Sequence, residues 1–522
     1  MAEIIDRISK LPVHIIHDIL GRACKYGLKE EAQICVLSKT WNSIWRGRPD
    51  VIIFQSNFHN KSLENFVQFV DDSLQPHIEQ NLRIETLRLM DLYSPELVSH
   101  MDRWIELATK HNVRFLEIGI SWSGSLYYTI PDSIYSAAKT LTKLSLYRCN
   151  FEINHNSTTN KLQKLIATCP LIRDLKLSRC RGLQNNLYVS GLVNLENLEL
   201  RACEKLDKVE IRAPKLCKFL HVGSPLHKHR KTHEPESLPC TIDILDGYNS
   251  LKYLHLEDST MTDQEFEYQL SKLTALEVLI LKGCYVMKNI NVVSEKLKRF
   301  SLWDWGNVEK VNMMLAPNLK MFDFEGIKMP FSISTMDPCK LERANLRFFL
   351  MPEFRNSYIF GNVETRWCNN IQDFVQKFNY SKGLIFVIIC EKNNSILIYE
   401  DPREILVPPT RELKLHIEIP SMCLESFAYN LIRNFHPKIV SIVPCTESKI
   451  LQVFRETTKE SRMKQYKQSK RLNEVSIHKG AVDNHEDNGR KSYMYSWLKS
   501  TCLIERITTF TFKWEKKVVT QD

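Results

Sequence analysis

Glycine is scarce in this sequence, with 16 residues among 522, and no long hydrophobic run is present. Few glycines argue against glycine-rich linkers and against a fold built from tight hairpins. The longest apolar run, Leu384–Cys390, suits a buried strand and falls far short of the ~20 residues of a membrane-spanning helix. The first residues are charged early and lack the apolar stretch of a signal peptide. We therefore expect a protein of the cytoplasm, the nucleus or both.

Motifs of catalysis and of metal binding are also missing. The 15 cysteines form no CxxC pair, which argues against a zinc ribbon, and in a reducing compartment they should remain thiols. Phosphate-binding glycine loops, GxSxG and HExxH do not occur. His227, His229 and His233 lie among lysine and arginine residues that would repel a cation, so we interpret them as part of a solvated loop. No catalytic residue, metal or cofactor is predicted.

The composition is that of a folded protein with a moderate excess of positive charge. Hydrophobic residues make up 43% and charged residues 25%, which are globular values. The net charge of +10 permits acidic partners but does not by itself indicate nucleic-acid binding. The length predicts two or three modules, or a repeat protein that grows without thickening its core.

The first fifty residues predict three short helices. Pro12 suits the first turn of a helix that carries apolar side chains on one face up to Leu20. A second helix is expected over Lys29–Val36, and a third after Ser38, ended by Gly47 and Pro49. A module this small cannot bury two tryptophans together with four isoleucines, so the surplus apolar surface suggests a docking face.

This segment resembles the F-box over residues 7–48. Leu11-Pro12 is followed by Ile15-Ile16 and Ile19-Leu20, and then by the element Cys35-Val36-Leu37-Ser38-Lys39-Thr40-Trp41. Cys35 stands where many members of the family have arginine. The resemblance implies binding to a Skp-type adaptor, which links to a cullin and a RING protein; a helical cap on the next domain is the alternative. The residues that would form or support the adaptor interface are Leu11, Pro12, Ile15, Ile16, Ile19, Leu20, Val36, Leu37 and Trp41.

A second pattern recurs along the chain, with apolar residues at offsets 0, 3 and 5 and cysteine at offset 8. This is the signature of leucine-rich repeats, in which the apolar positions stack between coils and the cysteine occupies a tight turn, where its thiol meets backbone groups. It predicts an irregular repeat solenoid, a horseshoe, over residues 80–350. Complete copies begin at Leu141, Ile172, Leu195 and Leu276, and weaker copies at Ile84, Val113, Cys217, Leu251, Leu297, Leu319 and Leu341.

The return segments of the repeats differ in length. Long repeats have room for a helix, as at Lys161–Ala167, whereas Pro214 in the short Val209–Leu216 segment favours a strand or irregular chain. The Ala-Pro-x-Leu element returns at Ala316. This alternation resembles the plant F-box/leucine-rich-repeat families over residues 7–350.

The strand positions between the inward leucines predict the binding surface. They are mixed in charge as far as Arg201 and then become aromatic and apolar, a composition that is typical of interface hot spots. A convex or terminal surface is the alternative. The predicted substrate-binding residues are Tyr253, Val278, Ile280, Arg299 and Trp303.

Beyond the repeats the pattern weakens. Residues 375–445 are expected to form degenerate repeats or an α+β cap. Residues 446–522 are expected to form a basic and polar region, with a helix or linker at Arg455–Arg471 and a mobile stretch up to Lys491. Strands are predicted at Leu384–Cys390, Ser395–Tyr399, Arg411–Ile419 and Pro437–Val443, and a helix at Leu424–Phe435.

The whole sequence therefore predicts an α/β protein: a three-helix F-box, a leucine-rich-repeat solenoid and a less regular α+β end. The function that the resemblance implies is a non-catalytic, substrate-recognition adaptor of an SCF-type ubiquitin ligase, which binds a protein target. The alternative is a leucine-rich-repeat scaffold that acts without a cullin. A receptor for a small ligand would need converging lysine and arginine residues, which are only scattered here. Neither a membrane nor nucleic acid is an expected partner.

Overall fold

The computed structural model describes most of the repeat region and several separate segments on either side of it. It covers residues 11–13, 15–16, 18–19 and 39–350, then residues 374 and 377, and the strands at 384–390, 413–418, 439–442, 470–480 and 507–516. Within 39–350 it omits 59–60, 123, 125, 138, 153–159, 184–185, 205, 224–239, 248, 285, 305–307, 327–329 and 332–333. The chain divides into two units, Met1–Met261 and Thr262–Asp522.

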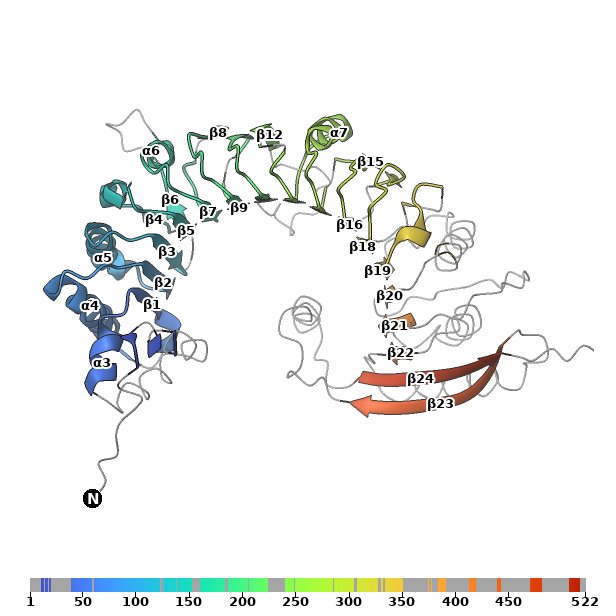
Figure 1. Ribbon diagram of the computed structural model, residues 1–522, viewed down its shortest axis with the longest axis horizontal. Coiled ribbons are helices and arrows are strands. Elements are labelled where there is room, and N and C mark those ends of the chain that lie inside the picture. The colour runs from blue at the N-terminus through green and yellow to red at the C-terminus, as the bar shows by residue number, and fades with distance from the viewer. Residues whose placement is uncertain are drawn as a thin grey trace, which may run out of the picture. The chain divides into compact units, whose positions relative to one another are not determined.

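The first unit contains a parallel sheet with one strand from each repeat. Consecutive repeats pair with each other, so the strand order follows the sequence order (Figure 1). The strands are β1 (Asp50–Phe54), β2 (Thr86–Leu92), β3 (Phe115–Ile120), β5 (Lys143–Tyr147), β7 (Asp174–Ser178), β9 (Asn197–Arg201), β11 (Lys218–Val222) and β13 (Tyr253–Glu257).

The second unit repeats this arrangement and ends in an antiparallel pair. Its parallel strands are β14 (Val278–Lys282), β16 (Arg299–Asp304), β18 (Met321–Gly326), β19 (Arg343–Leu350), β20 (Leu384–Cys390), β21 (Leu413–Glu418) and β22 (Ile439–Ile442). β24 (Ile507–Lys516) runs antiparallel to both β22 and β23 (Lys470–Gly480).

The buried positions of the strands follow the predicted offsets. Leu175 and Leu177 of β7 are buried, and they align with Leu144 and Leu146 on one side and with Leu198 and Leu200 on the other. Each fully buried leucine contributes about 2 kcal/mol, so the stacked columns supply most of the cohesion between repeats.

One predicted repeat start is wrong by one residue. Leu198 and Leu200 of β9 align with Phe219 and His221 of β11, and both of these side chains are buried. The repeat therefore begins at the buried Leu216 and not at Cys217, which is partly exposed. Phenylalanine and histidine in place of the two strand leucines hid the register.

The return segments confirm the predicted alternation of helix and strand. Helices α4, α5 and α6 lie on one side of the sheet of the first unit and cover its buried leucines (Figure 1). The short repeat contributes β10 instead, between β8 and β12. The bounds are α3 Lys39–Arg46, η2 Gln55–Phe58, α4 Leu63–Glu79, η3 Pro95–Leu97, α5 Val98–Lys110, β4 Tyr128–Thr129, η4 Asp132–Ala137, β6 Cys149–Asn150, α6 Lys161–Thr168, β8 Asn186–Ser190, β10 Lys208–Arg212, β12 Thr241–Asp246, α7 Asp263–Lys272, β15 Asn289–Asn291, β17 Lys310–Asn312 and η5 Pro338–Lys340.

A left-handed turn follows many of the parallel strands. Arg148, Arg179 and Ala202 have φ values of 57°, 50° and 49° at offset 7 of their repeats. The backbone N–H of each donates to the next repeat, as from Ala202 to the Val222 carbonyl at 2.7 Å. Such a backbone costs a residue with a Cβ about 1 kcal/mol, and the inter-repeat hydrogen bond helps to hold it.

The repeat cysteines lie one residue beyond this turn, as packing residues. Cys149, Cys180, Cys203 and Cys284 are all buried free thiols. The thiol of Cys180 donates to the carbonyls of Leu146 and Ser178, both at 3.5 Å. Burial raises the pKa of the Cys180 thiol well above its usual range, which favours the neutral thiol.

Three C-terminal strands match the predictions, and one expectation fails. β20, β21 and β22 lie at the predicted positions and extend the parallel sheet of the second unit, which favours degenerate repeats there. The polar stretch expected to be mobile contains β23, whose pairing with β24 provides the backbone hydrogen bonds. The segments predicted at Ser395–Tyr399, Leu424–Phe435 and most of Arg455–Arg471 lie outside the described residues.

A search of the described helices finds none with the length and apolar character needed to cross a membrane. The domain boundaries at 7–48, 80–350, 375–445 and 446–522 stay predictions.

His221 predicts a pH-dependent stability. Burial lowers its pKa to about 4, and its exposed fraction is 3%. In the unfolded chain the His221 side chain has a pKa near 6.5 and becomes protonated below that pH, whereas in the folded protein it stays neutral. The free energy of unfolding therefore falls as the pH drops below about 6.5. Between pH 7.5 and pH 5 the loss should be about 2 kcal/mol. His221→Leu, which restores the residue type at this offset, should remove that loss in urea unfolding curves at the two pH values.

The matched control is His100→Leu, on the partly exposed surface of α5, which should leave the pH dependence in place. An unchanged pH dependence in His221→Leu would contradict the assignment.

Ala202 tests the cost of the left-handed turn. Ala202→Gly should raise the free energy of unfolding by about 0.5–1 kcal/mol, because glycine adopts a positive φ without strain. The control Ala167→Gly, on the exposed surface of helix α6, should lower it by a similar amount. Chemical unfolding of the three proteins measures both changes, and a destabilised Ala202→Gly would show that the turn is not strained.

Candidate functional site

The N-terminal helical segment packs through a small apolar core. The Pro12 carbonyl accepts hydrogen bonds from the N–H groups of Ile15 and Ile16, at 2.9 and 3.1 Å, which closes the first helical turn. Ile16 lies buried against Trp41 of α3. Leu11, Ile19, Ile44 and Trp45 pack around this pair and stay partly exposed.

The predicted adaptor-binding residues differ in how far they are buried in this core. Ile16 and Trp41 are buried, whereas Pro12 is exposed and Ile15 has an exposed fraction of 39%. Leu11 and Ile19 lie between these extremes. Leu20, Val36, Leu37 and the second predicted helix lie outside the described residues, so the three-helix arrangement stays a prediction.

Helix α3 is joined tightly to the first repeat. The guanidinium of Arg48 lies over the Trp45 ring at 4.7 Å, and the Arg48 carbonyl lies 3.0 Å from Nε2 of the buried His77 in α4. Burial lowers the pKa of His77, which favours a neutral ring at this junction. The Pro49 carbonyl also accepts from the N–H groups of Glu85 and Thr86. These contacts hold α3 against the repeat that follows it.

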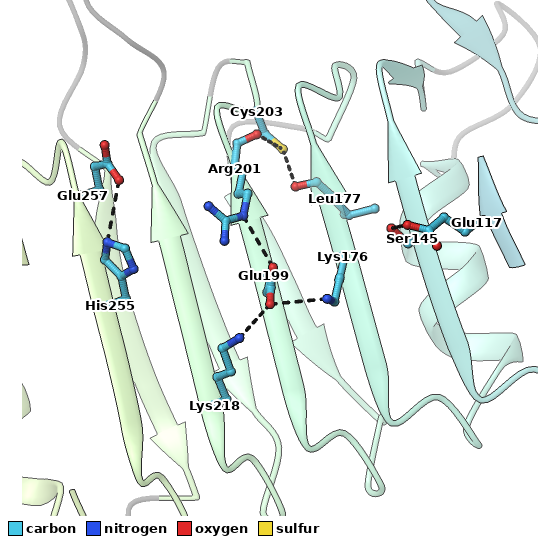
Figure 2. Close-up of polar contacts among 10 residues, drawn as sticks. All are labelled: Glu117, Ser145, Lys176, Leu177, Glu199, Arg201, Cys203, Lys218, His255 and Glu257. Atoms are coloured by element: carbon cyan, nitrogen blue, oxygen red, sulfur yellow. Dashed lines mark hydrogen bonds and ion pairs between the residues drawn. The ribbon is translucent and has the colours of Figure 1, made fainter. Parts of the chain in front are cut away.

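The exposed face of the sheet in the first unit carries a network of charges, and Glu199 is its centre. Figure 2 shows Glu199 on β9 between Lys176 of β7 and Lys218 of β11. Glu199 Oε1 lies 3.5 Å from Lys176 Nζ and 2.9 Å from Lys218 Nζ, and Glu199 Oε2 lies 3.4 Å from Arg201 Nε. One carboxylate thus meets three cations from three adjacent strands.

The environment of Glu199 keeps it ionised. Its exposed fraction is 7%, and this burial alone would raise the pKa of the carboxyl group. The hydrogen bond from Lys218 and the charges of Lys176, Lys218 and Arg201 outweigh burial, so the pKa lies below its usual value.

Smaller polar contacts flank this centre on the same face. On one side, Ser145 donates to Glu117 at 3.3 Å, and on the other the His255 ring lies 3.6 Å from the Glu257 carboxylate (Figure 2). Asp174 pairs with Lys143 at 3.5 Å. On this face β3, β7, β9 and β13 each carry a carboxylate, and β2, β5, β7, β9 and β11 each carry a lysine or arginine.

The predicted substrate-binding residues fall into two groups. Tyr253 lies on β13 of the first unit, with Lys218 Nζ over its ring at 5.3 Å. Val278, Ile280, Arg299 and Trp303 lie on β14 and β16 of the second unit, where Val278 pairs with Arg299. All five residues lie at the strand positions opposite the buried leucines, as predicted.

The second unit has its own charge centre at Asp323. Its carboxylate accepts from Arg299 Nε and Ser301 Oγ, both at 2.9 Å, and from the amide of Asn345. Lys282 Nζ lies over the Trp303 ring at 5.1 Å. The face therefore combines an aromatic side chain with a partly exposed arginine–aspartate ion pair, which is a typical composition of protein-binding surfaces.

The sequence predicted the exposed strand positions of the repeats as the binding surface, but it did not predict the charge centres at Glu199 in the first unit and Asp323 in the second. Glu199 and Asp323 occupy the middle position of their strands, and lysine or arginine lies nearby on the adjacent strands. Aligning the repeats by strand position would have shown this. Among the described residues no cluster of histidine, cysteine and carboxylate side chains could hold a metal ion, and the His227–His233 loop lies outside them.

A parallel sheet with one strand per repeat, buried leucines and a buried cysteine turn defines a leucine-rich-repeat domain. Comparison with known proteins agrees. A family model described as the leucine-rich-repeat domain of At1g61320/AtMIF1 matches residues 73–234 and 237–372, which is more than half of the chain. The chain belongs to the plant F-box/leucine-rich-repeat family.

Similar proteins include three from Arabidopsis thaliana. A putative FBD-associated F-box protein, At5g22720, is 27% identical over 50% of this chain and 57% of its own length. F-box/LRR-repeat protein 13 is 24% identical over 49% and 52%, and the putative F-box/FBD/LRR-repeat protein At4g26350 is 30% identical over 37% and 42%. The matches thus span roughly half the length of these relatives.

Glu199 provides a stability test of the charge centre. Glu199→Gln should lower the free energy of unfolding by about 1–2 kcal/mol, because three cations lose their shared carboxylate. The contribution should be present above the unfolded-state pKa of about 4.3 and be lost as pH falls through the lower folded-state pKa. Urea unfolding at pH 7 measures the change.

Glu196→Gln is the matched control, because Glu196 forms an exposed pair with Arg173 at 3.7 Å. It should change stability by less than about 0.5 kcal/mol. Equal losses in the two variants would contradict a special role for Glu199.

Proposed function

We propose that this chain is the substrate-recognition subunit of an SCF-type ubiquitin ligase. The N-terminal helical segment docks a Skp-type adaptor, which links to a cullin and a RING protein. The repeats, arranged as a solenoid, hold a protein target for ubiquitination. The names of the Arabidopsis relatives, which contain both F-box and leucine-rich repeat, support the combination at the level of the family.

The observation that carries the proposal is the exposed apolar pair Pro12 and Ile15. Both residues lie on a helical segment that the buried contact between Ile16 and Trp41 holds in place. An exposed isoleucine and an exposed proline lie on a segment that is already held by its own apolar core. Such a surface is suited to binding a hydrophobic partner. We assign direct adaptor contact to Pro12 and Ile15, with Leu11 and Ile19 beside them.

The target would bind on the exposed faces of the repeat strands. In the second unit Val278, Ile280, Arg299 and Trp303 offer apolar and aromatic surface beside a guanidinium that Asp323 already orients. In the first unit Tyr253 offers a ring beside Lys218. Oriented arginine and aromatic side chains lose little freedom on binding, which favours them as contact residues.

Such a subunit needs no catalytic residue or cofactor. The bond to ubiquitin would be made by the RING protein and the ubiquitin-conjugating enzyme, and this chain would contribute proximity by holding the target within their reach. The proposal places its action in the cytoplasm, the nucleus or both.

A pull-down with a purified Skp-type adaptor tests the docking face. Ile15→Asp should reduce capture at least about tenfold, because the contact buries an isoleucine worth about 1.5–3 kcal/mol. Aspartate in the first turns of a helix is compatible with the helix dipole, so the segment should still fold. Val98→Asp, at an exposed valine of α5, is the matched control and should bind normally.

Changes at Ile16 or Trp41 would not test docking, because both side chains are buried and their loss should unfold the segment. Failure of the folded intact chain to capture the adaptor would overturn the proposal. The chain would then be a leucine-rich-repeat scaffold that works without a cullin.

A further inference from the structure

The exposed face of β5, β7, β9 and β11 carries more positive than negative charge. Its strand positions bear two carboxylates, Asp174 and Glu199. Asp174 lies beside Lys143, and Glu199 is shared by three cations. The four cations are Lys143, Lys176, Arg201 and Lys218. The side chains of these cations keep exposed fractions between 36% and 53%, so they remain open to a further anion.

Arg179 adds a further cation at the carboxyl end of β7. Its left-handed backbone directs the chain over the end of the sheet, and its N–H donates to the Arg201 carbonyl at 2.7 Å. The Arg179 side chain is exposed and lies over the Tyr147 ring at 5.7 Å. Within the part of the chain that the structure describes, no carboxylate pairs with this guanidinium. Arg179 and Arg201 therefore lie at the ends of adjacent strands, and both guanidinium groups are accessible to a further anion.

We propose that this face docks an acidic segment of a partner protein. Aspartate or glutamate side chains of the segment pair with Arg179 and Arg201 at the strand ends and with Lys176 or Lys218 beside them. Arginine binds a carboxylate through two parallel hydrogen bonds, which makes the strand-end pair the anchor. The proposal deepens the function above by naming the chemistry of the target, and it rests on the repeat sheet being the binding surface.

The dimensions suit a short extended segment. Neighbouring strands lie about 4.8 Å apart, so β5 to β11 span roughly 14 Å. An extended peptide rises about 3.3 Å per residue, and about five residues cover this distance with alternate side chains on the sheet. A partner with a phosphate at every step would meet Asp174 and Glu199 in the middle of the face. Carboxylates spaced along a peptide avoid both, which is why we choose a protein segment over nucleic acid.

Fluorescence anisotropy with the full-length chain tests the proposal without any adaptor, so failure of the N-terminal docking cannot affect the result. The probe is a fluorescein-labelled 12-residue peptide of alternating Glu and Ser, and its partner control has Gln in place of Glu. The Glu peptide should bind in low salt and release as salt rises. Equal binding of the Gln peptide would overturn the proposal.

Arg179→Gln/Arg201→Gln should weaken binding of the Glu peptide about tenfold, because two charge pairs are lost. Arg179→Gln alone removes a side chain without a described ion pair, so it should weaken binding with the stability unchanged. The matched control Lys110→Gln/Lys164→Gln removes two positive charges from helices α5 and α6 and should bind as the unchanged chain does. Equal weakening in the control and the arginine pair would overturn the site.

Glu199→Gln distinguishes the site further, because it removes the carboxylate that competes for the same cations. It should tighten binding of the Glu peptide several-fold, and weaker binding by the folded variant would overturn the proposal. A phosphoserine peptide of equal net charge, or a DNA duplex, that binds more tightly than the Glu peptide would also overturn it in favour of a phosphate ligand.

Discussion

The repeat region depends on the stacking of apolar side chains from one strand onto the next in strict parallel register. Leu144, Leu175 and Leu198 form one such column, and Leu146, Leu177 and Leu200 form the next. Because alternate residues of a strand point to opposite faces, burying these columns forces the positions between them onto the other face. The charge centres at Glu199 and Asp323 are a consequence of that register. A change of one residue would exchange buried leucines and surface charges throughout a repeat.

The regular part of this architecture could be predicted from sequence because three offsets and one cysteine carry it. The prediction was wrong at Cys217, where Phe219 and His221 replace leucines and the apolar pattern fits two registers. It also failed at β23, whose polar residues suggested mobility, because β23 is held by pairing with β24, a separate strand later in the chain. Periodicity describes a segment alone, whereas backbone pairing depends on what lies beside it.

The candidate surfaces could be predicted only in outline. The F-box resemblance identified Ile15 and Ile16 together, but neighbouring residues on a helix point about 100° apart, and Trp41 selects Ile16 for the core. The left-handed conformation of the turns could not be predicted, because arginine at Arg148 and Arg179 and alanine at Ala202 are not residue types that favour a positive φ. Their conformation comes from the hydrogen bond to the next repeat and from the cysteine packed after it. Different residue types can therefore occupy the turn position, and in one repeat it is occupied by Arg179.

The backbone N–H groups of these turns can be used to measure the stability of individual junctions between repeats. The N–H groups of Arg148, Arg179, Ala202 and Gly283 each donate to the carbonyl of the following repeat. Each of these protons belongs to one junction between neighbouring repeats. In a protein whose repeats touch mainly their neighbours, opening of one junction releases one of them and leaves the others protected. Their exchange with deuterated solvent would therefore measure the cohesion of the repeat array one junction at a time.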